Sequence, residues 1–234
     1  MLGLSARAAR MMIVYTAVIG DTFPVCKPTA IDPAVRYLCF SDQPCAAPYE
    51  WIPTEPDPTP SLAAKRVKIL ADHPALQEAE ILLWHDSTYR LMGNLRWAHK
   101  ALVRADLAVM RHFRRTVLEH EGQAIARYGY LTPEQAEARV KWYRRKGFPT
   151  EWPVSSGGLV VRRLTPEVRA FNARWWRETT HVWGGRDQGS LDFSAWVEGV
   201  RMEHLPGTVR DNPYAIHKSS HPAPLPDHPS LVVA

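Results

Sequence analysis

The sequence predicts an α/β domain with a mostly parallel sheet and helices on both of its faces. Expected strands and helices alternate along the chain, which is typical of parallel sheets joined by crossover helices. The apolar strand segments show little period-two pattern, as expected when both faces of a sheet are covered. Polar side chains directly follow two of these strands, and ligands of such sheets bind beyond the carboxyl ends of the strands. With 234 residues, 45% hydrophobic and 23% charged, the chain can form a sizeable core.

The first third of the chain contains two expected strands and one helix. Residues 11–20 (MMIVYTAVIG) and 35–40 (VRYLCF) are rich in β-branched and apolar residues, which favours buried strands. Residues 43–60 contain six prolines, so we expect an irregular connection there. Ser61 is in position to cap a helix that runs to about Asp72.

The rest of the chain continues the alternation. The clearest helix signal is at 132–147, where Thr132 is followed by a proline, Gln135 completes a capping box and Gly147 follows the last turn. The other expected elements are strands at 80–85, 106–113 and 157–163 and helices at 94–103, 116–128, 165–180 and 186–199.

The two ends of the chain are expected to lie outside the domain. Residues 1–10 are interpreted as a disordered leader, since the apolar run after them is too short and lacks the cleavage site of a signal peptide. The domain is then 11–218, and 219–234 form an extended proline-rich tail. No stretch of the sequence is long enough to span a membrane.

Cysteine content and charge bear on compartment and ligand. The three cysteines, Cys26, Cys39 and Cys45, are odd in number and form no C-x-x-C pair, which favours free thiols in a reducing cytosol. We therefore expect a cytoplasmic protein. The formal net charge of +5 favours an acidic ligand such as a nucleotide, a phosphate or a nucleic acid.

A polar run ends the expected strand at 80–85. Asp86, Ser87 and Thr88 follow the apolar residues directly, one strand after a basic helix. Carboxylate and hydroxyl oxygens suit a hard divalent cation whose remaining ligands are water and phosphate. A solvated polar turn is the alternative, because aspartate and serine are common turn residues.

A second polar cluster precedes the last expected helix. Arg186, Asp187 and Gln188 follow two glycines. The carboxylate of Asp187 could cap the helix. It could instead orient a sugar or take a proton from an acceptor hydroxyl.

Two further segments allow a functional and a structural interpretation. The glycines of 155–158 (SSGG) could bring backbone amides close to a ligand, and the same composition occurs in ordinary loops. His217 and His221 near the carboxyl end either belong to a surface tail or include a histidine that closes over a metal.

The ordered set of motifs resembles a known family. The motifs are IVYTAVIGD, YLCFSD, KRVKIL, LLWHDST, HFRR followed by a glutamate, GFP, GGLVVRR, WW-x-E and RDQGSLDF, between residues 12 and 200. In this order they are similar to a glycosyltransferase-like family long catalogued as a domain of unknown function, which includes plant proteins linked to pectin and mucilage synthesis. The Arg-Asp-Gln-x-Ser segment and the W-x-D segment after an apolar strand are the most specific.

The resemblance implies a GT-A fold, a nucleotide-binding α/β sandwich that uses a nucleotide-sugar donor. In that fold an Asp-x-Asp-like motif at a strand end holds a divalent metal, Mn²⁺ or Mg²⁺, and the donor diphosphate. Asp86 and Thr88 occupy that place here, with His217 as a possible third ligand, and the second aspartate is absent.

The resemblance also implies roles for residues at the other strand ends. Lys65 and Lys68 would neutralise the donor diphosphate, where the family often has an arginine in place of Lys65. The residues expected to line the nucleotide are Tyr15, Thr16 and Asp42; those expected to face the transferred sugar and the acceptor are Ser155, Gly157 and Asp187, with Arg186 and Gln188 beside the last.

Two other classes of function compete with a glycosyltransferase. A nucleic-acid-binding protein would use the basic segments 111–115 (RHFRR) and 141–147 (KWYRRKG), and a combined version would transfer a sugar to a modified base in DNA. A non-catalytic member would bind a sugar nucleotide without turnover. The sugar, the acceptor, which could be a glycan or DNA, and the oligomeric state are not indicated by the sequence.

Overall fold

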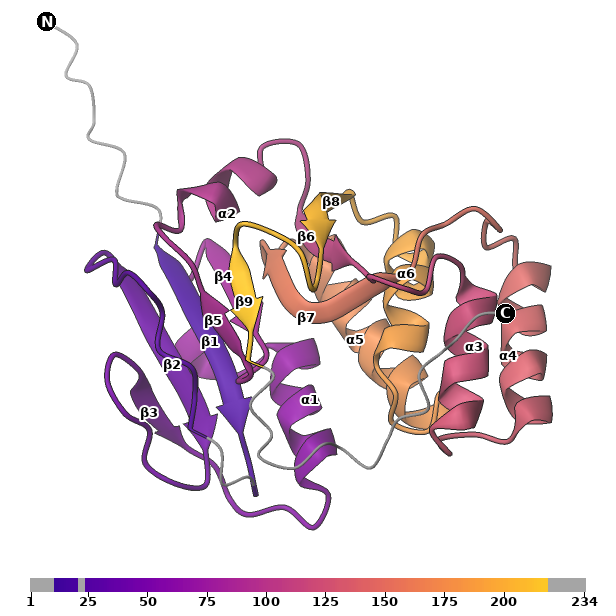
Figure 1. Ribbon diagram of the computed structural model, residues 1–234, viewed down its shortest axis with the longest axis horizontal. Helices are drawn as coiled ribbons and strands as arrows, with labels where there is room; N and C mark the ends of the chain where they lie inside the picture. Colours follow the sequence, from indigo (N-terminus) through magenta and orange to yellow (C-terminus); the bar gives the residue numbers. More distant parts are fainter. Residues whose placement is uncertain (1–10, 21–23, 219–234) are drawn as a thin grey trace, which may run out of the picture.

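A seven-stranded sheet in the order β3-β2-β1-β4-β7-β6-β8 runs through the molecule (Figure 1). The computed structural model describes residues 11–20 and 24–218, so the expected leader and tail lie outside the described residues. The strands of this sheet are β1 Met12–Val18, β2 Val35–Ser41, β3 Glu50–Pro53, β4 Ile81–His85, β6 Leu107–Arg111, β7 Ser155–Arg162 and β8 Met202–Thr208.

The sheet is mixed and mostly parallel, which confirms the predicted fold class. β1 pairs in parallel with β2 and β4, β2 with β3, and β6 with β8. β7 runs antiparallel to both of its neighbours, β4 and β6. The amino end of β7 therefore lies at the same edge of the sheet as the carboxyl ends of the other strands.

Both faces of the sheet are covered, which explains why the strands lack a period-two pattern. Three helices pack on one face, where Ile69 of α1, Trp175 of α5 and Leu191 of α6 join the apolar strand residues. The short helix α2 and a two-stranded sheet of β5 and β9 cover the other face. The bounds of these elements are α1 Pro60–Leu70, α2 Arg96–Ala101, α5 Pro166–His181, α6 Gln188–Val197, β5 Tyr89–Leu91 and β9 Ala215–His217.

Two further helices lie side by side at the end of the molecule opposite β3 (Figure 1). Helix α3 spans Leu118–Arg127 and α4 spans Pro133–Arg145. They form a separate aromatic cluster in which Tyr143 stacks on Phe193 of α6, with ring centroids 3.6 Å apart. This cluster fixes α3 and α4 against the carboxyl-terminal helices.

The structure corrects three expectations about elements. Helix α1 begins at Pro60, and Ser61 lies inside its first turn, so Ser61 is not the cap. The proline-rich connection contains the edge strand β3, because an edge strand tolerates a proline whose missing N–H faces away from the sheet. The sequence analysis also missed the short strands β5 and β9 and the strand β8.

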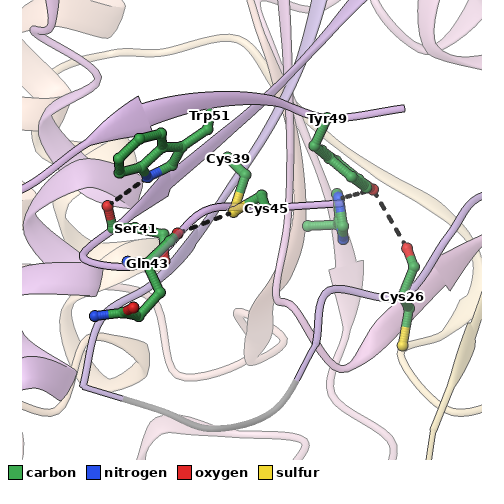
Figure 2. The surroundings of a disulfide bond; sticks show 8 residues. Cys26, Cys39, Ser41, Gln43, Cys45, Tyr49 and Trp51 are labelled. Carbon is green, nitrogen blue, oxygen red and sulfur yellow. Dashed lines mark hydrogen bonds between the residues drawn. A yellow bond between two sulfur atoms is a disulfide. The ribbon is translucent and has the colours of Figure 1, made fainter. Parts of the chain in front are cut away.

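The prediction of three free thiols is wrong for two of them. Cys39 of β2 forms a disulfide with Cys45 in the loop that leads to β3, with their Cα atoms 6.5 Å apart (Figure 2). Cys26 is free and buried. The pairing was missed because this spacing matches no cysteine motif, and only the turn after β2 brings the two sulfurs together.

The cytoplasmic location was predicted from three free thiols. Because Cys39 and Cys45 form a disulfide, these two residues no longer support that prediction. The location therefore stays a prediction. None of the helices in residues 11–20 and 24–218 has both the length and the apolar character to cross a membrane.

The capping box predicted for α4 is confirmed. Thr132 accepts a hydrogen bond from the backbone N–H of Gln135 at 3.2 Å, and the Gln135 side chain accepts from the N–H of Thr132 at 2.9 Å. Replacing Thr132 by alanine should lower the free energy of unfolding by about 1 kcal/mol in urea denaturation. Ser61→Ala is the matched control and should change it by less than about 0.5 kcal/mol, since Ser61 caps no helix. Equal losses would contradict the assignment of both helix starts.

Candidate functional site

A pocket of about 560 Å³ opens at the carboxyl ends of β1 and β4. The chain leaves β1 toward β2 on one side of the sheet, and β4 lies on the other side of β1. Ligands of α/β sheets bind at such a reversal of strand order, and we call this cavity the switch-point pocket. Its lining consists of Ala17, Val18, Ile19, Gly20, Pro60, Ser61, Ala64, Lys65, Lys68, Trp84, Asp86, Ser87, Arg186 and Asp187.

The centre of the pocket is an ion pair between α1 and the start of α6. Lys68 Nζ donates to Asp187 Oδ2 at 2.6 Å and lies 3.6 Å from Asp86 Oδ1. The side chains of Lys68 and Asp187 are 7% and 8% exposed, whereas that of Asp86 is 40% exposed. One ammonium group therefore connects three elements that are far apart in the sequence.

Neighbouring groups hold Lys68 in this position. Its ammonium lies over the indole rings of Trp84 and Trp175, 5.8 and 5.9 Å from their centroids. A Cβ atom on Gly157 would lie 2.8 Å from Lys68 Nζ, so the strand passes here only without a side chain. The predicted site residue Gly157 thus makes room for the lysine.

Tyr15 of β1 helps to hold the backbone of Lys68 in place. Its hydroxyl donates to the backbone carbonyl of Lys68 at 3.0 Å, and the buried Arg162 donates to both the hydroxyl and the same carbonyl. Tyr15 is fully buried and does not line the pocket. It positions the last turns of α1 and was predicted instead to contact the nucleotide.

Electrostatics keeps both members of the central pair charged. Burial by itself would raise the pKa of Asp187, but Lys68, Arg186 and Lys65 together hold that pKa well below its usual range. Burial would lower the pKa of Lys68, but Asp187 and Asp86 raise it above its ordinary value. A carboxylate that is so readily ionised is a weak base at neutral pH. Asp187 also makes no side-chain capping hydrogen bond, which argues against the cap interpretation.

The residues beside Asp187 are fixed by a buried glutamate that the sequence analysis noted only as one of two glutamates after the HFRR segment. Glu121 of α3 is fully buried and accepts hydrogen bonds from Arg186 Nε at 3.4 Å and Gln188 Nε2 at 3.0 Å. Arg115 Nε lies 2.9 Å from the same carboxylate. Gln188 therefore faces Glu121, and Arg186 reaches from Glu121 to the wall of the pocket. The sequence offers no sign of this contact, because Glu121 looks like an ordinary charge in the first turn of a helix.

The predicted metal ligands lie on neighbouring segments, because His217 of β9 pairs with Tyr89, and each of them already has other contacts. Asp86 Oδ1 already accepts from Trp84 Nε1 at 2.9 Å beside the Lys68 ammonium. His217 Nδ1 accepts from Arg210 at 2.7 Å, and its ring packs against Tyr89. For Thr88, the backbone carbonyl accepts from the N–H of Lys218 at 2.7 Å.

The contacts of Asp86 bear on the predicted divalent site. Its Oδ1 is held by an indole N–H and lies 3.6 Å from the Lys68 ammonium, so a cation there would lie close to a positive charge. Within the part of the chain that the structure describes, no three or more His, Cys, Asp or Glu residues cluster as metal ligands would. The divalent metal stays a prediction, and we assign no chemical step to it.

The remaining predicted donor residues have separate positions. Lys65 lines the pocket and donates to the carbonyl of Gly185 at 2.9 Å. Asp42 acts through the backbone, since its Oδ2 accepts from the N–H of Gly20, which lines the pocket. Thr16 is fully buried on β1. Thr16 and Asp42 are therefore near the pocket but not part of its lining.

Ser155 belongs to a second polar cluster beneath α6. Its hydroxyl donates to Asp192 Oδ1 at 2.5 Å and lies 2.9 Å from His204 Nε2, and its N–H donates to Asp192 Oδ2 at 2.8 Å. Burial raises the pKa of Asp192 to about 7, against the opposing effect of the Ser155 hydrogen bonds. Burial, aided by Arg111, lowers the pKa of His204 to about 4. Ser155 is fully buried here and does not line the switch-point pocket.

Comparison with known proteins adds little to this picture. No protein-family model matches the chain, and no curated protein matches its sequence. One solved structure that aligns with it is mouse xyloside xylosyltransferase 1 in its apo form, at 10% identity over 83% of this chain and 84% of that chain, with a TM-score of 0.49. A likeness at this level supports no statement about activity, and the family indicated by the sequence motifs stays a prediction.

Because of the central ion pair, two substitutions that each remove a negative charge should differ strongly in their effect on the free energy of unfolding. Asp187→Asn leaves the buried Lys68 ammonium without its main counterion and should lower the free energy of unfolding by about 3–5 kcal/mol. Asp86→Asn removes a half-exposed carboxylate farther from the ammonium and should cost about 1 kcal/mol or less. Urea unfolding of the two variants measures both values. If Asp187→Asn is as mild as Asp86→Asn, the pair does not hold α1 to α6.

Asp192 predicts a specific dependence of stability on pH. Its raised folded-state pKa means that the folded protein binds more protons than the unfolded chain between about pH 4 and about pH 7. The stability that protonated Asp192 contributes is fully present below that window and is lost as pH rises through it. The free energy of unfolding then falls by up to about 1.4 kcal/mol per pH unit. Asp192→Asn should remove this slope in urea unfolding at several pH values, while Asp72→Asn, on the surface, should retain it. An unchanged slope in Asp192→Asn would show that Asp192 is ionised in the folded protein.

Proposed function

We propose that this chain is a glycosyltransferase that binds a nucleotide-sugar donor in the switch-point pocket. The observation that carries the proposal is the buried pair of Lys68 and Asp187 at the bottom of a pocket at the strand-order reversal. Ionisable groups in a cleft whose pKa is shifted by burial and by a specific charged partner cluster at functional sites. The order of sequence motifs, which includes both residues of the pair, supports the same activity.

The charges on the pocket suit a diphosphate. Three cationic side chains, Lys65, Lys68 and Arg186, line the same cavity as two carboxylates, Asp86 and Asp187. The pocket thus has a small positive excess, which favours an anionic ligand. Lys65 and Arg186 are partly exposed and can donate charge-assisted hydrogen bonds to phosphate oxygens.

The proposed reaction joins the donor sugar to an acceptor hydroxyl. The acceptor oxygen forms a bond to C1 of the sugar while the bond from C1 to the phosphate oxygen breaks, and its electron pair moves to the nucleoside diphosphate. The acceptor proton passes to the diphosphate oxygen that gains this pair. The fixed positive charges of Lys65, Lys68 and Arg186 stabilise the charge that develops on the leaving diphosphate.

Asp187 has a different role in this scheme from a general base. Its lowered pKa and its hydrogen bond to Lys68 keep it ionised, so it accepts a hydrogen bond from a sugar hydroxyl and orients the donor. A divalent metal, if one binds, would supply additional positive charge at the diphosphate. The pocket cations provide such charge without it.

Binding of nucleoside diphosphates tests this proposal. In a thermal-shift panel of UDP, GDP, ADP, CDP and TDP, at least one should stabilise the protein, by about 2.7 kcal/mol at 100 times its Kd. Lys65→Met should weaken that binding by about tenfold or more, because a charge-assisted hydrogen bond to phosphate is lost. The panel is run with EDTA and with Mn²⁺, and we expect binding in both.

The matched control is Arg66→Met on the same helix. Arg66 is exposed, pairs with Asp72 at 3.3 Å and does not line the pocket, so its loss should leave nucleotide affinity unchanged. Absence of binding by every nucleotide under both conditions would contradict the proposed function. Binding that requires Mn²⁺ would instead restore the metal site predicted at Asp86.

A further inference from the structure

An exposed aromatic ring flanked by arginines lies at the edge of the sheet that carries the pocket. Phe113 is 39% exposed, and the guanidinium groups of Arg114 and Arg210 lie 5.0 and 5.4 Å from its ring centroid. Arg111, also exposed, ends β6, and the N–H of Val209 after β8 donates to its carbonyl at 3.0 Å. We call Arg111, Phe113, Arg114 and Arg210 the arginine–phenylalanine patch.

The positive charge of this patch has no carboxylate counterion in the part of the chain that the structure describes. Among residues 11–20 and 24–218, no carboxylate forms an ion pair with Arg111, Arg114 or Arg210. Burial, together with Arg115, Arg186, Arg114 and Arg210, lowers the pKa of His112 to about 3. His112 is therefore neutral at physiological pH, and its Nδ1 accepts from the N–H groups of Arg114 and Arg115, which fixes the loop that presents the ring.

Two chains of contacts connect the patch to the switch-point pocket. On one side Arg115, which follows Arg114 and shares His112 with it, pairs with Glu121 together with Arg186, and Arg186 lines the pocket. On the other side Arg210 donates to His217, whose ring packs on Tyr89 with centroids 4.9 Å apart.

Tyr89 continues this second chain to the pocket. A Cβ atom on Gly158 would lie 3.0 Å from the Tyr89 ring and 3.4 Å from Asp86 Oδ2, so ring and carboxylate approach the same point of β7. The patch and the pocket therefore lie at the same edge of the sheet, where β6 and β8 end and β7 begins, and the buried Glu121 and Tyr89 link them.

We propose that the arginine–phenylalanine patch binds a nucleic-acid strand that carries the acceptor hydroxyl to the switch-point pocket. This proposal rests on the proposed function and names its acceptor class. Arginines that have no carboxylate partner among the described residues, around an exposed ring, match a strand whose phosphates need cations and whose bases stack on aromatic faces. An uncharged glycan would leave the charge of the three arginines without a counterion, so the charge favours a polyanion.

The second basic segment of the sequence does not form such a surface. Within 141–147, Lys141 pairs with Glu137 at 2.5 Å and Arg144 pairs with Glu119 at 2.7 Å. Arg145 and Lys146 are exposed at the carboxyl end of α4. Lys146 lies over the ring of Trp142, which packs against the aromatic cluster. These two residues provide a control surface of equal charge.

Fluorescence anisotropy with a labelled single-stranded DNA of about 20 nucleotides, at several salt concentrations, tests the proposal on the full chain. The double variant R114A/R210A should bind more weakly and lower the slope of log K against log salt by about 1.4, or 0.7 per lost phosphate contact. Phe113→Ala should weaken binding about tenfold through lost stacking, with a smaller change in salt slope. The control R145A/K146A should bind like the unaltered protein.

Three outcomes would overturn the proposal. The DNA fails to bind, the patch and control variants lose affinity equally, or polygalacturonate competes for the patch while the loss of Phe113 has no effect, which would indicate an acidic glycan. Nucleoside-diphosphate binding is measured on the same samples. If a diphosphate binds and DNA does not, only the acceptor proposal fails; if no diphosphate binds, the proposed function fails, and with it the acceptor role of the patch.

Discussion

The hydrogen-bonded ion pair between Lys68 and Asp187 is the constraint on which the site depends. It joins the helix that follows β3 to the start of the last helix, across a distance of 119 residues in sequence. Removing either charge would leave the other buried without its main counterion, which costs several kcal/mol. The surrounding groups are arranged accordingly: two indoles face the ammonium, and Gly157 leaves it space.

The edge of the sheet that carries the Lys68–Asp187 pair contains two regions with different charge. Around the pair, partly exposed cations face a cavity and suit a diphosphate. Farther along the edge, Glu121 pairs with Arg115 and Arg186, while the arginines beside Phe113 have no carboxylate partner within residues 11–20 and 24–218. A donor on one side and a polyanionic acceptor on the other would thus meet near Arg186, at the boundary between the two regions.

The sequence was most informative where the local signal is strong. The apolar strands, the Thr132 capping box and the polar run at Asp86 follow from side-chain pattern alone. In the structure Asp86, Asp187, Lys65 and Lys68 line one pocket, and their predicted roles stay predictions. It was least informative where pairing is nonlocal. An edge strand within a proline-rich segment has no periodicity to reveal it.

By itself the sequence determined the class of fold, the order of most elements and the set of polar residues at the strand ends. Only the tertiary structure decided which of them share a cavity. In the folded chain Tyr15 donates a hydrogen bond to the backbone of Lys68, Ser155 donates one to Asp192, and Cys39 forms a disulfide with Cys45. The physical reason is that hydrogen bonds, ion pairs and disulfides depend on distances of a few ångströms between segments that the chain brings together only when the sheet has formed.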